Sequence, residues 1–445
     1  MGTGIGHYVP LVVYLGGWVM CLVSLTGRPL YGLYYLMPLL PYRSLRDHYF
    51  EYPLGGNMLT ILVVAVIAGA LIHGRRLPKS KLYMIWVVFA VYLYFSMWIG
   101  TMMGTEPTPL WTSDINFVTW KDYMIIPLVF VAAGLVVQDR KAVKTVIFIT
   151  AFSLLLIDKS ALATSLAHNF SHFDESKRDG GPLGFAGSNG LGAFLAQFAV
   201  FFWGFGQYLK RIKLKLICYT LVSITLLATM YTFSRGSYLA VLTSVFVLAV
   251  LKDRKLLVVV AVFLLMWQSV VPTAVRERIN MTETSTGQLE SSAQARVDLW
   301  ENAKQTIISS PVFGTGYASF QYGSHVDNLK DTHNWYVKVM VETGVIGAVF
   351  VLLLLQQMIS LPYRLFRAAK DPLYQGLGLG LLLAVFSCLV SNMFGERWTY
   401  VEINGLLWVL CGTATRALEL AQQEAATEAT EDALAAEMPP YMAYR

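Results

Sequence analysis

Long apolar runs alternate with short polar segments along almost the whole chain. With its flanks included, each of the clearest runs approaches or reaches the roughly 20 residues that a helix needs to cross the hydrocarbon core of a bilayer. The runs are too long and too apolar for the strands of a membrane barrel, so we expect helices. The pattern predicts an all-α, polytopic integral membrane protein with about 12 transmembrane helices. The clearest runs are residues 59–72, 82–103, 143–157, 191–206, 216–233, 238–251, 256–271, 345–355 and 377–390.

The polar segments between the runs are of two kinds. Five of them are short and basic, and short basic loops remain on the cytoplasmic side. Because these five occupy alternate positions, they all fall on the same side of the membrane, which supports the arrangement as a whole. The basic loops are residues 75–81, 139–144, 210–215, 252–255 and 364–370, and the opposite side receives residues 105–121, 158–188, 234–236, 272–332 and 394–399.

Residues 29–41 are apolar but short and bounded by prolines, so they could form a span or a re-entrant or interfacial segment. If they do not span, both termini lie in the cytoplasm. The first apolar stretch has no basic start and no clear cleavage site, so we expect a retained span. The chain then divides into N-terminal transmembrane helices (1–271), one long outer loop with short helices (272–332), C-terminal transmembrane helices (333–416) and a cytoplasmic tail (417–445).

Composition supports the membrane interpretation and narrows the chemistry. The 445 residues are 56% hydrophobic and 14% charged, whereas soluble domains average about 25% charged residues. The formal net charge of +6 is concentrated in the cytoplasmic loops, so it does not indicate nucleic-acid binding. The four cysteines fall in apolar runs without a CxxC motif, and no outer loop holds an Asp-x-Asp motif. We therefore expect neither a metal nor another cofactor.

The long outer loop contains one segment with a helical pattern. Within residues 293–309, Arg296 and Trp300 recur at helical spacing together with two apolar residues, so they share a face. Pro311 is expected to end this helix, and residues 314–317 are expected to form a turn. Arg296 could bind a ligand, or it could bridge an acidic neighbour on its own helix.

Arg235 lies on the outer side, in a short turn between two strongly apolar runs. An arginine at the edge of a membrane is costly unless it is paired or hydrated, which favours a functional role. A snorkelling anchor is the alternative, but that role suits cytoplasmic arginines better. Together with Arg296 it would suit a diphosphate, because planar guanidinium groups match phosphate oxygens in bidentate pairs. Arg276 and Arg278 could extend the same basic surface.

His333 lies at the outer start of the run that ends at residue 355, directly after Thr332, a favourable helix cap. Its ring would then occupy the first helical turn, where the positive end of the helix dipole favours the neutral imidazole. A neutral imidazole can accept a proton near neutral pH, as a general base must. The alternative is an interfacial histidine in an aromatic belt with Trp335 and Tyr336.

Further polar residues could support a site on this side. Lys338 and Glu342 are four residues apart in one run, so they would form an ion pair that either fixes helix packing or binds a ligand. Asn189 opens another run after a glycine-rich turn and could bind a sugar or cap the helix. Arg397 and its neighbour Glu396 form another outer pair, whose role the sequence leaves open. The candidates for support are Asn189, Trp300, Tyr336, Lys338, Glu342 and Arg397.

Five motifs, in this order, resemble the O-antigen ligase and polymerase superfamily. They are Ser234-Arg235-Gly236 after an apolar run, Arg296 in the long outer loop, Pro311-Val312-Phe313-Gly314-Thr315-Gly316, His333-Asn334, and Glu342-Thr343-Gly344-Val345-Ile346-Gly347. The resemblance in motifs covers about residues 187–347, and the number of spans extends it loosely to the whole chain. As an ordered set, the motifs are specific at the level of the superfamily.

The resemblance implies a bacterial inner-membrane glycosyltransferase of the GT-C type. Such proteins take a glycan from undecaprenyl pyrophosphate at the periplasmic face and need no metal. By position in the motifs, Arg235 and Arg296 would hold the pyrophosphate. His333 would assist the attack of an acceptor hydroxyl on the anomeric carbon. Direct displacement would invert that carbon, and the arginines would stabilise the leaving diphosphate.

The superfamily contains several activities that share this donor. Ligases attach O-antigen to lipid A–core, polymerases join repeat units of O-antigen or exopolysaccharide, and some relatives glycosylate proteins. The compact outer loop and the spacing of arginine, histidine and glutamate resemble those of ligases. We therefore expect lipid A–core as the acceptor, with a growing glycan, and hence a polymerase, as the alternative.

A flippase or transporter of lipid-linked oligosaccharides is the alternative outside enzymes. It too would have many spans and buried charges, but it should show paired halves with internal repeats. No such duplication is visible, and the candidate residues gather on one side, which suits one-sided chemistry. A purely structural scaffold would need neither Arg235 nor the charged pair of residues 338 and 342. The expected partners are a lipid-linked glycan donor, its acceptor and membrane lipids, without nucleic acid.

Overall fold

The computed structural model describes residues 8–102, 114–166, 172–175, 178, 185, 187–281, 291–322 and 332–437. These residues form helices and connecting segments, without a strand among them, so the all-α prediction is confirmed. The helices are α1 (Val9–Leu25), α2 (Pro29–Leu39), α3 (Arg43–Asp47), η2 (His48–Glu51), η3 (Gly55–Asn57), α4 (Met58–Ile72), α5 (Lys81–Met102), α6 (Ile115–Tyr123), α7 (Ile125–Val136), α8 (Arg140–Leu166), α9 (Gly187–Gly206), α10 (Ile212–Tyr231), α11 (Arg235–Leu251), α12 (Lys255–Val270), α13 (Thr273–Asn280), α14 (Ser291–Ser309), α15 (Ser319–Tyr322), α16 (Trp335–Ala368), α17 (Pro372–Met393) and α18 (Val401–Glu437).

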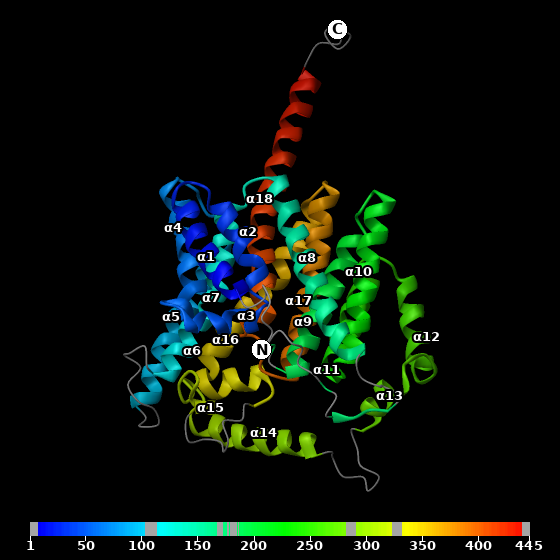
Figure 1. Cartoon of the computed structure of the whole chain (residues 1–445). Coiled ribbons are helices and arrows are strands. Elements are labelled where there is room, and N and C mark those ends of the chain that lie inside the picture. The colour runs from blue at the N-terminus through cyan, green and yellow to red at the C-terminus, as the bar shows by residue number, and fades with distance from the viewer. Residues whose placement is uncertain are drawn as a thin grey trace.

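The helices are those of a polytopic membrane protein, as the sequence pattern predicted. Within the described part of the chain, eight helical segments are long and apolar enough to cross a membrane, and the pair α12–α13, bent by 106°, can provide a ninth. The apolar helices α1 and α11 have 17 residues each. The first half of α18 also runs through the bundle (Figure 1).

Helix α2 settles how residues 29–41 fold. It has only 11 residues, so it spans roughly 16 Å at 1.5 Å per residue, about half of the hydrocarbon core. Its apolar side chains are nevertheless buried, with Leu33, Leu36 and Met37 each 0% exposed.

The chain crosses the bundle at α2 even though this helix is short. Gly27, just before α2, abuts His73 beside the basic loop of residues 75–81, whereas Arg46, just after α2, pairs with Glu402 at the far end of the bundle, where α18 begins. The expectation that residues 29–41 do not span, which placed both termini on one side, is therefore wrong, because the short helix α2 and the turn after it together carry the chain across.

The basic loops lie at one end of the bundle, which we call the basic end. Arg140, at the start of α8, pairs with Asp371, just before α17. Lys252, after α11, lies 3.6 Å from the ring centroid of Tyr208, which follows α9. The α4–α5 and α7–α8 connections line one shared cavity. The exposed last part of α18 projects from this same end (Figure 1). The prediction that the five basic loops share one side is confirmed.

Helix α9 forms the centre of the bundle, with 89% of its apolar window buried. It packs closely on α17 because glycines allow the two backbones to approach. A Cβ atom added to Gly204 would lie 3.0 Å from the Cα of Gly380, and one added to Gly380 would lie 2.5 Å from the carbonyl oxygen of Phe201. Small residues at such crossings are typical of helix packing in membranes.

The end opposite the basic end carries the candidate residues of the long loop. Helix α14 lies across this end, nearly at right angles to the bundle axis (Figure 1). It ends at Ser309, two residues before Pro311, as the sequence predicted. Its inner face includes Ala303, which is 0% exposed and packs with Phe320 and Val341. The elements at this end therefore surround the outer tips of α11, α16 and α17.

Candidate active site

The segment before α16 differs from the prediction in its cap. The helix begins at Trp335, and its N-cap is Asn334, whose side chain accepts hydrogen bonds from the backbone N–H groups of residues 336 and 337. Thr332, predicted as the cap, is instead buried, and its hydroxyl donates to the carbonyl of Asn334 at 2.7 Å. The predicted cap is thus wrong, because Thr332 forms a local hydrogen-bonded turn and leaves the helix end to asparagine.

His333 consequently lies two residues before the helix, not in its first turn. Its φ angle is +53°, in the left-handed region that non-glycine residues adopt uncommonly. Such a conformation persists only where surrounding contacts determine it, and these sites cluster where function needs a fixed geometry. The side chain is exposed. The argument from the first helical turn therefore no longer applies, and the turn between Thr332 and Asn334 positions the ring.

Helix α14 contacts this turn through Trp300. The indole Nε1 of Trp300 donates to the carbonyl oxygen of Thr332 at 2.9 Å. Arg296 lies one helical turn earlier on α14, on the same face, and is half-buried. The face of α14 that carries Arg296 and Trp300, predicted from the sequence, is therefore directed toward the His333 turn.

Arg397 lies in the connection between α17 and α18 and is only 7% exposed. Its guanidinium donates to the carbonyl of Ser391 and, at 3.2 Å, to that of Phe394. Burial lowers the pKa of Arg397 to about 10; Glu396 opposes this shift, and the positive charge of Arg296 adds to it. The group is still a cation at neutral pH, and the positive charge of Arg296 acts on it.

Two tryptophans join the Arg397 segment to the His333 segment. Trp335 and Trp398 stack with ring centroids 4.3 Å apart and an interplanar angle of 14°. The indole Nε1 of Trp398 donates to the hydroxyl of Tyr123 at 2.6 Å, which anchors the stack in the core. The residues that directly precede Trp335 and Trp398 are therefore held in one rigid frame.

Arg235 is the first residue of α11 and is half-buried. The turn before it is tight, since Phe233 has a φ angle of +51°, and Ser237 donates to the hydroxyl of Ser234 at 2.9 Å. A Cβ atom on Gly236 would lie 3.0 Å from the Cβ of Phe394, so this turn abuts the connection that carries Arg397. Neighbouring segments thus carry the two arginines.

Helix α13 flanks the same turn on another side, through an apolar cluster that includes Phe233 and Val275. Its Arg278 is 5% exposed and lies 4.9 Å over the ring of Phe173. Arg276 differs, because its guanidinium donates to the carbonyl of Gln268 at 2.7 Å, at the end of α12. Arg278 therefore lies beside the Arg235 turn, whereas the guanidinium of Arg276 is directed toward the end of α12.

Two residues at this end were missed by the sequence analysis. Glu175 pairs with both Arg178 and Arg278, the latter at 3.5 Å. Arg178 also donates to the side-chain oxygen of Asn189 at 3.0 Å, so Asn189 serves as an acceptor for this cation. Residues 158–188 show no periodic pattern that could have singled out this pair. The buried Arg278 and Arg178 add to the positive charge beside Arg235.

The Pro311–Gly316 loop and the 342–347 motif form one structure. Gly344 has a non-helical backbone (φ +59°) that interrupts α16. In an unbroken helix, the N–H groups of residues 345 and 346 would bond the carbonyls of residues 341 and 342. Here those N–H groups bond the carbonyls of residues 311 and 312, at 2.9 and 3.3 Å. The freed carbonyls accept from the N–H groups of residues 315 and 316, both at 2.9 Å.

Glu342 sits directly before this break and is 2% exposed. Lys338, one turn earlier, is half-buried. The hydroxyl of Tyr336 donates to the carbonyl of Leu389 on α17 at 2.9 Å, which ties the start of α16 to the core. The ion pair predicted for residues 338 and 342 stays a prediction, whereas Tyr336 has a packing role.

Much of this site lies in a part of the chain that matches a known protein family. Residues 220–352 match the family model described as O-antigen ligase. This part of the chain is similar to the O-antigen ligase family. The match confirms the recognition made from the motifs, and it includes Arg235, Arg278, Arg296 and His333, while Arg397 lies beyond it. No curated protein matches the sequence. The match supports a function of the O-antigen ligase or polymerase type in general.

Proposed function

We propose that this protein is an O-antigen ligase of the bacterial inner membrane. It would transfer a glycan from undecaprenyl pyrophosphate to a hydroxyl of lipid A–core at the periplasmic face. The proposal rests mainly on the positive charges of Arg296 and the buried Arg397, which act on each other beside the His333 turn. Arg296 and His333 lie within the region that matches the O-antigen ligase model, and Arg397 lies outside it. The end with these residues is opposite the basic end, which the positive-inside rule assigns to the cytoplasm.

Arginines at this end would bind the pyrophosphate. A buried guanidinium such as that of Arg397 is costly without an anion, and two neighbouring cations raise that cost. A diphosphate would offset it through charge-assisted bidentate hydrogen bonds. Arg235, on the abutting turn, is placed to contact the same anion, and Arg278 adds positive charge beside that turn. These groups would also stabilise the charge that develops on the leaving group.

His333 would act on the acceptor. As a neutral imidazole it would take the proton of the acceptor hydroxyl while the oxygen attacks the anomeric carbon of the donor sugar. The bond from that carbon to the pyrophosphate oxygen breaks as the new glycosidic bond forms. The anomeric centre is therefore inverted, and undecaprenyl pyrophosphate leaves with the electron pair. The fixed turn of residues 332–334 would hold the ring while the exposed side chain meets the acceptor.

A reconstituted transfer assay tests the proposal. Purified protein in liposomes would receive an undecaprenyl-pyrophosphate glycan, with or without lipid A–core, in EDTA. We expect a product only with lipid A–core, and at least a ~100-fold lower rate for His333→Ala, within the typical contribution of a general base. Because His48 is also exposed, His48→Ala is the matched control and should transfer at the wild-type rate.

Other results would replace the proposal. Longer glycans on the carrier lipid without lipid A–core would identify a polymerase. Movement of the glycan across the bilayer without transfer would identify a flippase. An unchanged rate for His333→Ala would remove the histidine from the mechanism. Comparison of α- and β-linked products would show whether the anomeric carbon is inverted.

A further inference from the structure

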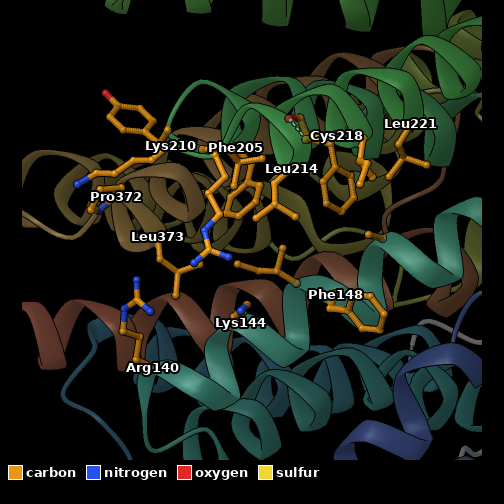
Figure 2. Close-up of a pocket in the computed structure, with 17 residues that line it drawn as sticks. Arg140, Lys144, Phe148, Phe205, Lys210, Leu214, Cys218, Leu221, Pro372 and Leu373 are labelled. Atoms are coloured by element: carbon orange, nitrogen blue, oxygen red, sulfur yellow. Dashed lines mark hydrogen bonds between the residues drawn. The ribbon is translucent and has the colours of Figure 1, made fainter.

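A cavity of about 490 Å³ lies at the basic end, between α8, α9, α10 and the start of α17. Its two parts differ in chemistry. Arg140, Lys144, Lys210 and Arg211 contribute cations, whereas Phe148 and its neighbours on α8 and α10 form apolar walls. Figure 2 shows Arg140 and Lys210 toward one side, with Phe148, Leu214 and Leu221 extending away from them.

The cations come from two separate stretches of chain that meet at this cavity. Arg140 begins α8, and Arg211 directly precedes α10. Each helix therefore presents basic side chains at its N-terminus, where the macrodipole already favours an anion. The positive-inside rule explains cations in these loops, but it does not explain why they converge on one cavity. The summed field favours an anion between the two helix ends.

Internal carboxylates neutralise only part of this charge. Asp371 pairs with Arg140 and also caps α17 through the N–H of Leu373 at 2.9 Å. Within the described ranges, no salt bridge connects Lys144 to a carboxylate, and the same holds for Lys210 and Arg211. Although burial opposes the shift, Arg140 and also the charge of Lys210 lower the pKa of Asp371, so this one carboxylate is shared between Arg140 and Lys210. The four cations of the cavity therefore keep a net positive charge for an external anion.

The apolar walls form a wedge that opens toward the bilayer. Phe148 on α8 is 68% exposed, and Ile217 on α10 is 66% exposed. Farther along, the two helices are held together, since the hydroxyl of Thr225 donates to the carboxyl of Asp158 at 2.6 Å and both residues are 0% exposed. The helices thus separate toward the basic end and leave apolar surface for a hydrocarbon chain.

We propose that this cavity binds an anionic phospholipid from the leaflet at the basic end. Its phosphate would lie among Lys144, Lys210 and Arg211, and an acyl chain would fill the wedge between α8 and α10. Basic pockets between transmembrane helices on the cytoplasmic side bind such headgroups. A phospholipid is favoured over a free anion because it satisfies both the cations and the apolar walls. The proposal does not depend on the transferase activity.

Native mass spectrometry of the delipidated full chain tests this site. The lipids would be phosphatidylglycerol and cardiolipin, with zwitterionic phosphatidylcholine of matched chains, inorganic phosphate and undecaprenyl phosphate as comparisons. Replacement of Lys144, Lys210 and Arg211 together by Gln should weaken phosphatidylglycerol binding at least ~10-fold, since each cation near an anionic headgroup contributes roughly fivefold. The matched control replaces the exposed Arg75, Lys79 and Lys81 by Gln, which removes the same charge outside the cavity.

A second variant tests the wedge without changing charge. Ala151→Trp, on the lining of α8, should fill the wedge and lower phospholipid affinity while inorganic phosphate binding stays the same. Equal binding of phosphatidylcholine and phosphatidylglycerol would overturn the proposal, as would equal losses in the cavity variant and its control. Competitive binding by inorganic phosphate alone would indicate a simple anion site. Preferential binding of undecaprenyl phosphate would assign the cavity to the carrier lipid and overturn the phospholipid assignment.

Discussion

Trp335 and Trp398 stack face to face at 4.3 Å, and this contact joins the two chain segments on which the proposed site depends. One ring follows His333 by two residues, and the other directly follows Arg397. Both indoles are nearly buried, at 3% and 0% exposure. A change in the stack should therefore move the histidine relative to the arginine without removing either.

Trp398→Ala tests this dependence. Loss of the large side chain should lower stability by about 3–5 kcal/mol and the transfer rate by about 100-fold, because misplacement of reacting groups by 1 Å has effects of that size. Thermal unfolding in detergent and transfer assays would measure the two effects. Phe201→Ala is the control, since Phe201 is 0% exposed and packs with Phe202 and Phe205 in the part of α9 nearer the basic end; it should lose similar stability but keep most activity below its unfolding temperature. Equal losses of activity would contradict a positioning role.

Gly344→Ala should disrupt the joint between α16 and the Pro311–Gly316 loop. A Cβ atom there would lie 2.3 Å from the carbonyl oxygen of Val312, and the residue has a φ angle of +59°. We expect a loss of more than about 2 kcal/mol, because the clash adds to the strain of a backbone conformation (φ +59°, ψ −163°) that essentially only glycine adopts. Gly74→Ala is the control for a positive φ angle without a clash, since Gly74 has a φ angle of +71° with nothing within 4 Å of its added Cβ. Similar unfolding temperatures for the two variants would refute the clash.

Arg397→Lys should reduce donor binding even though the charge remains. The lysine ammonium cannot reproduce the planar guanidinium fork that two carbonyls hold in place. We therefore expect the Kd for the donor to rise 10- to 100-fold, which corresponds to the loss of about one charge-assisted hydrogen bond. Arg416→Lys is the matched control at the basic end, where Arg416 is 9% exposed and donates to the carbonyls of Arg76 and Gly134. It should lower stability similarly and leave donor binding unchanged. A donor Kd that moves equally in both variants would point to a general structural effect.

Acidification should release the segment around Phe173 from α13. A hydrogen bond from the backbone N–H of Phe173 and one with the His172 ring hold the pKa of Glu277 below its usual range. A depressed pKa means that this contact stabilises the docked segment above the usual pKa of about 4.5 and is lost as pH falls further. Hydrogen exchange at pH 7 and pH 3, with each rate divided by the intrinsic rate at that pH, should show weaker protection near Phe173 in acid. Glu277→Gln should lose most of this pH dependence.

The membrane architecture was predictable because it depends on local composition. Apolar runs of about 20 residues must cross the bilayer as helices, and the basic loops then fix which ends lie together. The prediction for 293–309 also succeeded, since Arg296 and Trp300 follow the helical period. These features need no knowledge of distant contacts.

Tertiary contacts account for what the sequence did not predict. Thr332 and Asn334 are both residue types that cap helices well. Asn334 becomes the cap because Thr332 forms a local turn with it, and Trp300 holds that turn through the Thr332 carbonyl. The burial of Arg397 depends on carbonyls of the α17 end, and the Glu175–Arg178 pair depends on the docking of an aperiodic loop. The interruption of α16 was missed because the segment has the apolar composition of a continuous helix.

The interruption at Gly344 also determines when α16 acquires its final shape. The groups that replace its missing hydrogen bonds come from residues 311–316, which precede the helix in the chain. An isolated segment of residues 335–368 has no such partners, and unsatisfied backbone groups in hydrocarbon cost several kcal/mol each. The free segment should therefore be an uninterrupted helix in lipid. The break is a product of assembly, and it forms only when the preceding outer loop docks against the helix.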